Sequence, residues 1–173
     1  MSLFASYRHL FQAGYVTHDL ERAMETVTRE FGAGDYYLAE HTVPVSVDGK
    51  ADEITMRVAI ASADGRQLEI IQPVSGAVGI YTEGIDFTAS DIVFHHVGIG
   101  VTGSHANWEA LEAEIAAQGQ AFKVLFPPEP GPEPMVRYGY VDTRRWCGHY
   151  TEYLWWGEAL CDSPTYPGFE NGQ

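Results

Sequence analysis

The chain has 173 residues, 45% hydrophobic and 20% charged, which is the composition of a folded globular protein. Its 24 acidic and 10 basic residues give a formal net charge of -14, which repels nucleic acid and anionic membrane surfaces and excludes both as expected partners. No apolar run reaches the roughly 18 residues of a membrane span, and the two cysteines, Cys147 and Cys161, allow neither a disulfide framework nor a cysteine zinc site, so we expect a cytoplasmic protein.

The first predicted module covers residues 8–73 and starts with a strand at 11–16, followed by an amphipathic helix at 18–32. Apolar side chains of this helix recur at spacings of three and four residues, which is the pattern of one buried helix face. Gly32 is a typical stop signal for such a helix. The predicted buried face consists of Leu20, Met24, Val27 and Phe31.

Three further strands complete the first module. Two Asp-Gly pairs, at 48–49 and 64–65, lie between apolar runs, and this dipeptide favours a tight hairpin turn. The stretch 74–91 is rich in Gly and Ser and has few periodic signals, so we expect a linker there. The three strands are predicted at about 36–45, 53–62 and 66–72.

The second predicted module, residues 92–157, repeats the order of the first. A strand at 94–101 precedes a helix at about 104–118, for which Ser104 is the predicted N-cap and Gly119 the stop signal. Each module is therefore predicted to be βαβββ, and the chain to be an α+β protein. The remaining predicted features are a helix face of Trp108, Leu111 and Ile115, strands at 121–126, 135–142 and 149–156, a proline-rich loop at 127–134 and an irregular tail at 158–173.

The two modules carry polar side chains at corresponding positions of their first and last strands. Gln12 and Glu69 are 57 residues apart, and His96 and Glu152 are 56 apart. Because side chains alternate between the faces of a strand, each of these residues shares its face with small or apolar neighbours. A carboxylate in apolar surroundings is costly unless it is paired, and two carboxylates facing one cavity repel each other. A divalent cation relieves both costs, so we predict one metal ion held by Gln12, Glu69, His96 and Glu152.

This ligand set has one imidazole and three oxygens. It suits Zn, Ni, Co, Mn or Fe(II), with one or two coordination positions left for water or substrate. Gly14 and Gly98 share the strand faces of Gln12 and His96, and we expect these glycines to leave room for a substrate.

Three other histidines are rivals for the metal positions. His95 is the main rival of His96, but it lies one residue away and is therefore expected on the opposite strand face. His9 and His18 are weaker rivals for Gln12, because His9 has the wrong parity on its strand and His18 lies at the start of a helix.

Residues 8–156 resemble the vicinal-oxygen-chelate superfamily of glyoxalase, bleomycin resistance and extradiol dioxygenase proteins. The strand and helix that lead to Phe31-Gly32 resemble the opening of one module, and FHHVGIGV at 94–101 resembles the metal-bearing strand of the second. The segments QLEIIQP and GHYTEYL resemble the two closing strands that bear glutamate. The resemblance implies a curved mixed sheet around a metal and substrate cavity. The metal positions of the superfamily map onto Gln12, Glu69, His96 and Glu152, and Gln at the first position is similar to the animal glyoxalase I type.

The resemblance implies a metal-dependent isomerase, epimerase or lyase that removes a proton next to a metal-bound carbonyl. Glu152 is the first candidate for the general base, and Glu69 is its expected partner. Two alternatives stay open. One is a non-catalytic protein that binds hydrophobic small molecules, as the resistance proteins of the superfamily do. The other is an Fe(II) ring-cleaving dioxygenase, for which Gln12 replaces an expected histidine.

Aromatic and cationic side chains of the last third are candidates for binding a small-molecule substrate. Tyr138, Tyr140 or Tyr150 could supply a hydroxyl near the metal, Arg137 could anchor a carboxylate or phosphate, and Trp155 could line a pocket for a bulky substrate. We also expect a homodimer, because open sheets of this kind expose edges that need cover. The sequence allows the four metal ligands to come from one chain or from two subunits.

Overall fold

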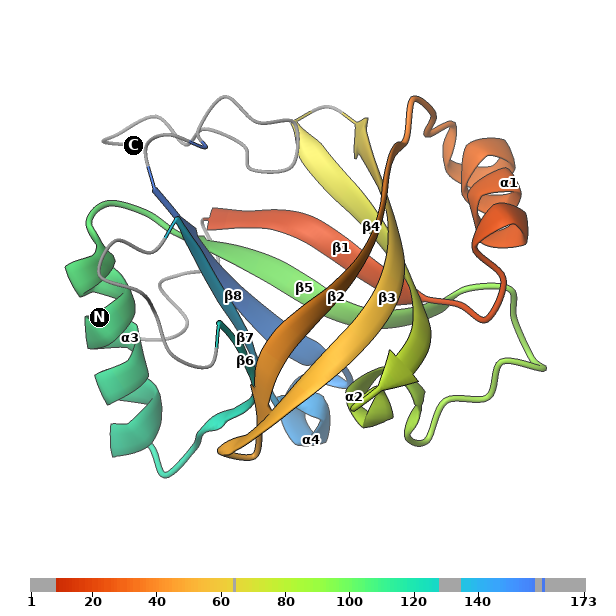
Figure 1. Ribbon diagram of the computed structural model, residues 1–173. Helices are drawn as coiled ribbons and strands as arrows, with labels where there is room; N and C mark the ends of the chain where they lie inside the picture. Colours follow the sequence, from red (N-terminus) through yellow and green to blue (C-terminus); the bar gives the residue numbers. More distant parts are fainter. Residues whose placement is uncertain (1–8, 64, 128–134, 158–159, 161–173) are drawn as a thin grey trace.

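The computed structural model describes residues 9–63, 65–127, 135–157 and 160. These residues form eight strands and four helices, and their order confirms the predicted α+β architecture of two βαβββ modules (Figure 1). The first module contains β1 (Leu10–Val16), α1 (Leu20–Phe31), β2 (Tyr37–Val47), β3 (Lys50–Ala63) and β4 (Arg66–Gly76). The second contains β5 (Val93–Val101), α3 (His105–Ala117), β6 (Phe122–Phe126), β7 (Val136–Val141) and β8 (Tyr150–Trp156). Two short helices, α2 (Gly79–Thr82) and α4 (Arg144–Cys147), follow β4 and β7.

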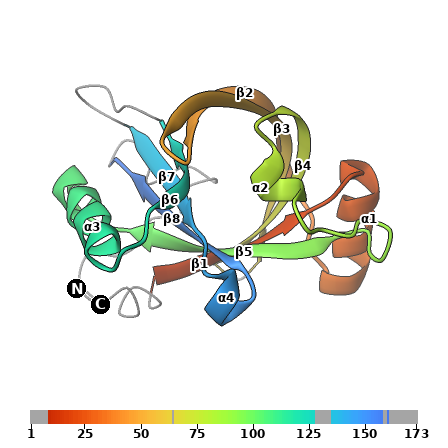
Figure 2. The same cartoon turned by 90° about the horizontal axis from the view of Figure 1, so that it is seen from below.

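The eight strands close into one barrel in the order β1-β4-β3-β2-β6-β7-β8-β5. The two modules meet at two seams. β1 runs antiparallel to β5 along most of its length, whereas β2 and β6 share only the pairs Ser46–Leu125 and Val47–Val124. In Figure 2, β1 and β5 form the floor, β2 and β3 arch over it, and α1 and α3 lie outside. Because the barrel is closed, the described strands lack the open sheet edges from which the homodimer was predicted.

Helix α1 ends at its predicted stop signal but begins at Leu20, two residues later than predicted. The Asp19 side chain accepts a 3.1 Å hydrogen bond from a backbone N–H of the first turn, and Gly32 has a left-handed φ of 68°. Leu20 and Val27 are buried, as predicted. Phe31 is instead 53% exposed. The predicted buried face is therefore wrong at its end, because Phe31 is the last helical residue.

The Asp48-Gly49 pair forms the predicted hairpin turn. Asp48 and Gly49 have φ angles of 47° and 78°, as both central positions of a type I′ turn require. Because only these two residues are unpaired, β2 and β3 pair from the turn outward and are longer than predicted. Gly65, with a φ of 73°, lies in the turn between β3 and β4, and residue 64 lies outside the described residues.

Helix α3 covers the outer face of the second module. Trp108, Leu111 and Ile115 are buried there, as predicted. Ser104 occupies the N-cap position, but its side chain makes no capping hydrogen bond. The predicted loop at 127–134 and tail at 158–173 lie outside the described residues, apart from residues 127 and 160.

The stretch between the modules contains elements that periodicity did not reveal. β4 continues to Gly76, and α2 follows with Tyr81, whose side chain is 1% exposed and packs into the barrel interior. A helix of four residues is too short to show a periodic pattern, so periodicity could not predict it. Among the described residues, no helix combines the length and apolar character of a membrane span.

Candidate metal and substrate site

Four adjacent strands of the barrel carry the four predicted metal ligands. β4, β1, β5 and β8 lie side by side and contribute Glu69, Gln12, His96 and Glu152. The Nε2 atom of His96 lies 3.3 Å from Oε2 of Glu69 and 3.5 Å from Oε2 of Glu152. The same Nε2 atom lies 3.3 Å from Oε1 of Gln12. The structure thus brings all four side chains together within a single chain.

The geometry and chemistry of this quartet fit one divalent ion. Ligands held about 2.1 Å from one metal lie roughly 3 to 4 Å from one another. The candidate ligand atoms of Glu69, His96 and Glu152 all lie within 4.8 Å of one another. The Oε2 atoms of both glutamates are buried and have no hydrogen-bond partner among the described residues. Because such orphaned oxygens are costly, a cation would compensate both.

A glycine makes room for a ligand on each of the two central strands. Gly14 of β1 pairs with Glu69 on one side and with His96 on the other. A Cβ atom on Gly14 would lie 1.9 Å from Cε1 of His96, and one on Gly98 would lie 2.7 Å from Oε1 of Gln12. The prediction that these glycines leave room for a substrate is therefore wrong, because the ligand side chains fill that space.

His95 lies on the same side of the sheet as His96, which corrects the expectation from strand parity. Gly14 pairs with His96 and Tyr15 with Phe94, so His95 is the extra residue of a β-bulge. A bulge redirects side chains. The Nδ1 atoms of the two histidines are 3.0 Å apart, and both rings contact Tyr140.

The hydrogen bonds of His95 determine which nitrogen of His96 faces the site. The Nε2 atom of His95 lies 3.0 Å from the carbonyl oxygen of Ile80, which can only accept, so this nitrogen carries the proton. Burial first, and then His96, lowers the pKa of His95 to about 3, so the ring is neutral. Its Nδ1 therefore accepts a hydrogen bond from Nδ1–H of His96. In the neutral ring this leaves a lone pair on Nε2 of His96, the form that binds metal.

Gln67 orients the amide of Gln12 in a similar way. The Nε2 group of Gln12 donates to Oε1 of Gln67 at 3.4 Å, which turns Oε1 of Gln12 toward the ligands. Gln67 is 4% exposed and precedes Glu69 by two residues on the same face of β4. Strand alternation therefore predicts that Gln67 lies beside Glu69 on the inner face of β4.

Burial and mutual charge shift the acidities within the quartet. Burial alone would lower the pKa of His96, but the carboxylates of Glu69 and Glu152 outweigh it and raise that pKa. Burial raises the pKa of Glu152 to about 7, with His96 opposing the rise and Glu69 adding to it. Without a cation the quartet therefore retains protons near neutral pH, and a metal would displace them.

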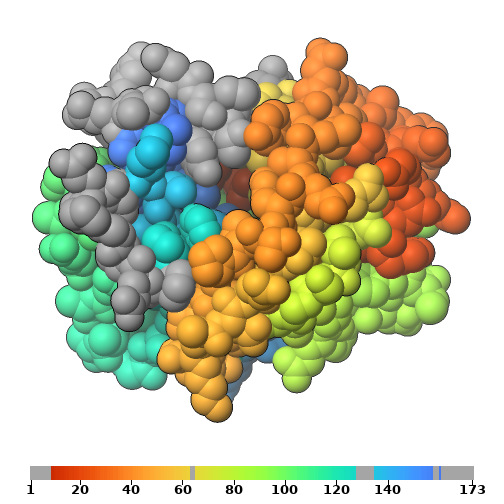
Figure 3. Space-filling model, in the orientation of Figure 1, coloured from red at the N-terminus to blue at the C-terminus, as the bar shows by residue number. Residues whose placement is uncertain are grey.

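A cavity of about 380 Å³ lies above the quartet. Gln12, Glu69 and Glu152 line its polar floor. The surface is hollowed between β2 and β7 in Figure 3. Alternate residues of the β2–β3 hairpin face inward and form a roof, which consists of Tyr37, Ala39, His41 and Val43 from β2 and Met56, Val58 and Ile60 from β3.

The three tyrosines predicted to bind substrate lie at different depths. Tyr138 and Tyr140 of β7 line the cavity. Tyr140 is 1% exposed, and burial, followed by the charge of Glu152, raises its pKa. Tyr150 does not line the cavity, and its ring packs against His95 at a centroid distance of 4.9 Å.

Arg137 and Trp155 lie on the outer face of the sheet rather than at the cavity. The guanidinium of Arg137 lies over the Trp108 ring and 3.3 Å from Glu112 of α3. The indole N–H of Trp155 donates to the carbonyl oxygen of Gly103 at 2.9 Å. The structure therefore does not bring these two side chains to the predicted site.

Sequence reasoning missed the roles of two further residues beside the site. His95 supports His96 through a bulge that no sequence pattern indicated. Tyr81 reaches the cavity from α2, and its hydroxyl lies 3.4 Å from that of Tyr140. Both residues depend on irregular backbone, which hydrophobic periodicity does not reveal.

Several solved structures have the same fold. Methylmalonyl-CoA epimerase from Mycobacterium tuberculosis matches with a TM-score of 0.57 and 15% identity, over 88% of this chain and 91% of that chain. A methylmalonyl-CoA epimerase in complex with methylmalonyl-CoA and NH4+ matches with a TM-score of 0.53 and 16% identity, over 87% and 95% of the two chains. A hypothetical protein from Bacillus halodurans C-125 matches with a TM-score of 0.50 and 14% identity, over 86% and 94%.

These likenesses show the fold, which this chain shares with the two methylmalonyl-CoA epimerases. They confirm the predicted resemblance at the level of the fold. No protein-family model matches the sequence, and no curated protein does.

Proposed function

We propose that this protein is a metal-dependent isomerase, epimerase or lyase of the glyoxalase-like type. The observation that carries the proposal is the convergence of Gln12, Glu69, His96 and Glu152 at the floor of one cavity. The epimerases among the structural neighbours support it, because epimerisation next to a carbonyl is a proton transfer at carbon.

The quartet would hold one divalent ion, for which we propose Zn, Ni, Co, Mn or Fe, and this ion would polarise a substrate carbonyl as a Lewis acid. Glu152 is the general base. Its carboxylate lines the cavity, and burial, which raises the pKa of this group to about 7 in the metal-free chain, favours its taking up a proton. When Glu152 takes the proton, the electron pair of the broken C–H bond moves toward the carbonyl oxygen.

Glu69 completes the proton transfer from the other half of the site. Its carboxylate also lines the cavity and contacts the same nitrogen of His96 as Glu152 does. For inversion, Glu69 takes a proton from water and returns it to the same carbon from the other side, while Glu152 releases its own proton to water. For isomerisation, Glu152 returns its proton to the neighbouring carbon. Tyr140 of β7 pairs with Glu152 of β8 and lines the cavity beside it.

Metal analysis combined with proton exchange tests this function. Protein purified without chelators should contain close to one divalent ion per chain. In deuterated water the loaded protein should exchange the C1 proton of 1-hydroxy-1-phenylpropan-2-one, an uncharged hydroxyketone, faster than chelated protein. Absence of bound metal after purification and after addition of all five ions would overturn the proposal.

A hydrophobic binding protein without catalytic activity is the second candidate, because the cavity roof is largely apolar. Such a protein would bind hydrophobic ligands equally well after chelation, and it would exchange no protons. The ring-cleaving dioxygenase has less support, because the quartet contains one histidine where that chemistry usually has two. Oxygen uptake with catechol and Fe(II) would revive it. The homodimer and the cytoplasmic location stay predictions.

A further inference from the structure

The cavity has no arginine or lysine among its described lining residues. His41 is the one side chain of the roof that can become a cation, and it is exposed to water, where a single imidazole anchors an anion weakly. The described cations of the chain point elsewhere. Most are paired outside the barrel, in the ion pairs Arg22–Asp91, Arg29–Glu30, Arg57–Glu21, Lys123–Asp48, Arg137–Glu112 and Arg144–Asp142.

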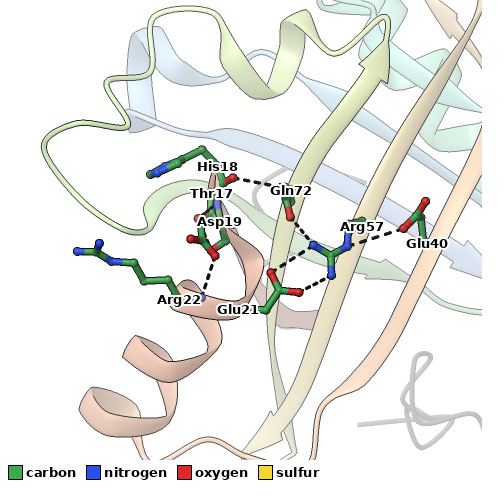
Figure 4. A network of polar contacts seen from close by, with 8 residues as sticks. All are labelled: Thr17, His18, Asp19, Glu21, Arg22, Glu40, Arg57 and Gln72. Carbon is green, nitrogen blue, oxygen red and sulfur yellow. Dashed lines mark hydrogen bonds and ion pairs between the residues drawn. The ribbon is translucent and has the colours of Figure 1, made fainter.

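Arg57 shows how close a cation comes without entering the cavity. It lies on β3 between Met56 and Val58, whose side chains face inward, so its own side chain faces outward. Figure 4 shows the guanidinium held outside by Glu21 of α1, by Glu40 of β2 and by Gln72.

The segments outside the described residues add little positive charge. Residues 128–134 and 161–173 contain neither arginine nor lysine, and they include Glu129, Glu133, Asp162 and Glu170. In residues 1–8 the one cation is Arg8. The sequence therefore supplies almost nothing that could anchor an anion from these segments.

The charge of the quartet itself also disfavours an anion. Gln12 is neutral, and the carboxylates of Glu69 and Glu152 together balance a divalent ion, so the loaded site has no net charge. A bound carboxylate would bring a third negative charge beside two buried ones, with no described cation to compensate it.

From these observations, and resting on the proposed function, we infer that the part of the substrate that enters the cavity is uncharged. It carries one or two oxygens for the polar floor and a largely apolar body, aliphatic or aromatic, that lies under the roof of Val43, Met56, Val58 and Ile60. A cavity of about 380 Å³ suits a molecule with a single ring or a short branched chain. Free carboxylates and phosphorylated sugars are therefore poor ligands.

Two isosteric probes test this inference. The first, 1-phenyl-1,2-propanedione, has two adjacent carbonyl oxygens and no charge. The second, benzoylformate, replaces the methyl group by a negatively charged oxygen. A divalent ion free in solution attracts the anion more strongly than the dione. A preference of the loaded protein for the dione must therefore come from the protein around the metal. Calorimetric titration of the Zn²⁺-loaded protein should give at least about tenfold tighter binding of the dione.

A charge placed in the roof provides the matched variant. Val43→Lys puts an ammonium group into the cavity and should shift the preference toward benzoylformate by about tenfold or more. Pro44→Lys adds the same charge to the exposed outer face of β2 and should leave the preference unchanged. The wild-type titration decides the inference even if Val43→Lys does not fold.

The possible results of these titrations test the uncharged substrate and the proposed function separately. Equal or tighter binding of benzoylformate by the wild-type protein overturns the uncharged substrate and leaves the metal site intact. Binding of neither probe to metal-loaded protein also overturns it. Failure to bind any metal overturns the proposed function instead.

Discussion

Glu69 on β4 and Glu152 on β8 occupy corresponding positions in the two modules, but their side chains are 14% and 5% exposed. Tyr140 of β7 pairs with Glu152, and burial raises the pKa of Glu152 to about 7. The histidine ligand of the second module has the support of His95 and the carbonyl of Ile80, whereas Gln12 of the first relies on Gln67. The repeat thus explains the four candidate ligand positions, and the parts that do not repeat give each position different surroundings.

Replacing each glutamate by glutamine should reveal the difference between Glu69 and Glu152 most strongly. Glu152→Gln keeps an oxygen ligand but removes the base, so the rate of proton exchange should fall by about 10²- to 10⁴-fold. Glu69→Gln should cost less, because its carboxylate is the partner rather than the first base. Rates are measured at equal metal loading, which is checked by metal analysis. A larger loss for Glu69→Gln would place the base in the first module.

The two glycines of the central strands should also respond unequally. Gly14→Ala drives a Cβ atom into the imidazole of His96, which His95 holds from behind, so it should lower stability by about 1–3 kcal/mol and strongly weaken metal binding. Gly98→Ala meets the flexible side chain of Gln12 and should cost less.

Thermal denaturation and metal titration compare these variants. Gly34→Ala is the matched control, because a Cβ atom there has no neighbour within 4 Å. If Gly14→Ala bound metal like Gly34→Ala, the placement of the His96 ring against β1 would be incorrect.

Replacing His95 or Gln67, the residues that orient His96 and Gln12, should have smaller effects on metal affinity, and the two effects should differ. His95→Phe keeps a ring of similar size but removes the acceptor for Nδ1–H of His96, so metal affinity should fall by about 10- to 100-fold. Gln67→Leu frees the amide of Gln12 and should cost less than tenfold, roughly, because a neutral oxygen contributes less to the metal. Nitrogen-15 spectra of His96 give a second measurement, because in His95→Phe the proton of the His96 ring should no longer be confined to Nδ1. Unchanged spectra and affinity in His95→Phe would contradict the proposed support.

The pH dependence of stability should be the smallest effect. Glu152 and His96 have raised pKa values in the folded chain without metal, so the folded state binds more protons than the unfolded state. Their contribution to stability is therefore complete below the unfolded pKa values and declines as pH rises through about 7. Chelated protein should lose a few degrees in melting temperature, roughly, between pH 6.5 and pH 8, where His95 is mostly neutral in the unfolded chain and its lowered pKa no longer opposes the trend. Metal-loaded protein should lose less, because the cation replaces those protons. Equal slopes for the two forms would contradict this prediction.

Much of the fold and the quartet could be predicted from local patterns. The helical face of Leu20 and Val27 and the turn at Asp48-Gly49 follow from periodicity and from backbone preference. The nearly equal spacing of the candidate ligands, 57 and 56 residues in the two modules, follows from the repeat. The outward position of Arg137 could also have been expected, since Tyr138 faces the cavity and neighbouring strand residues alternate.

By itself the sequence determined two βαβββ units and four polar side chains on the strands that face inward, because strand alternation and helical periodicity are local properties of the chain. Only the tertiary structure decided that the barrel closes within one chain, that a bulge turns His95 behind His96, and that Tyr81 enters from the segment between the modules. These features depend on strand register and on contacts between residues far apart in the chain. Register is decided when the two modules pack together, so no local pattern of residues encodes it.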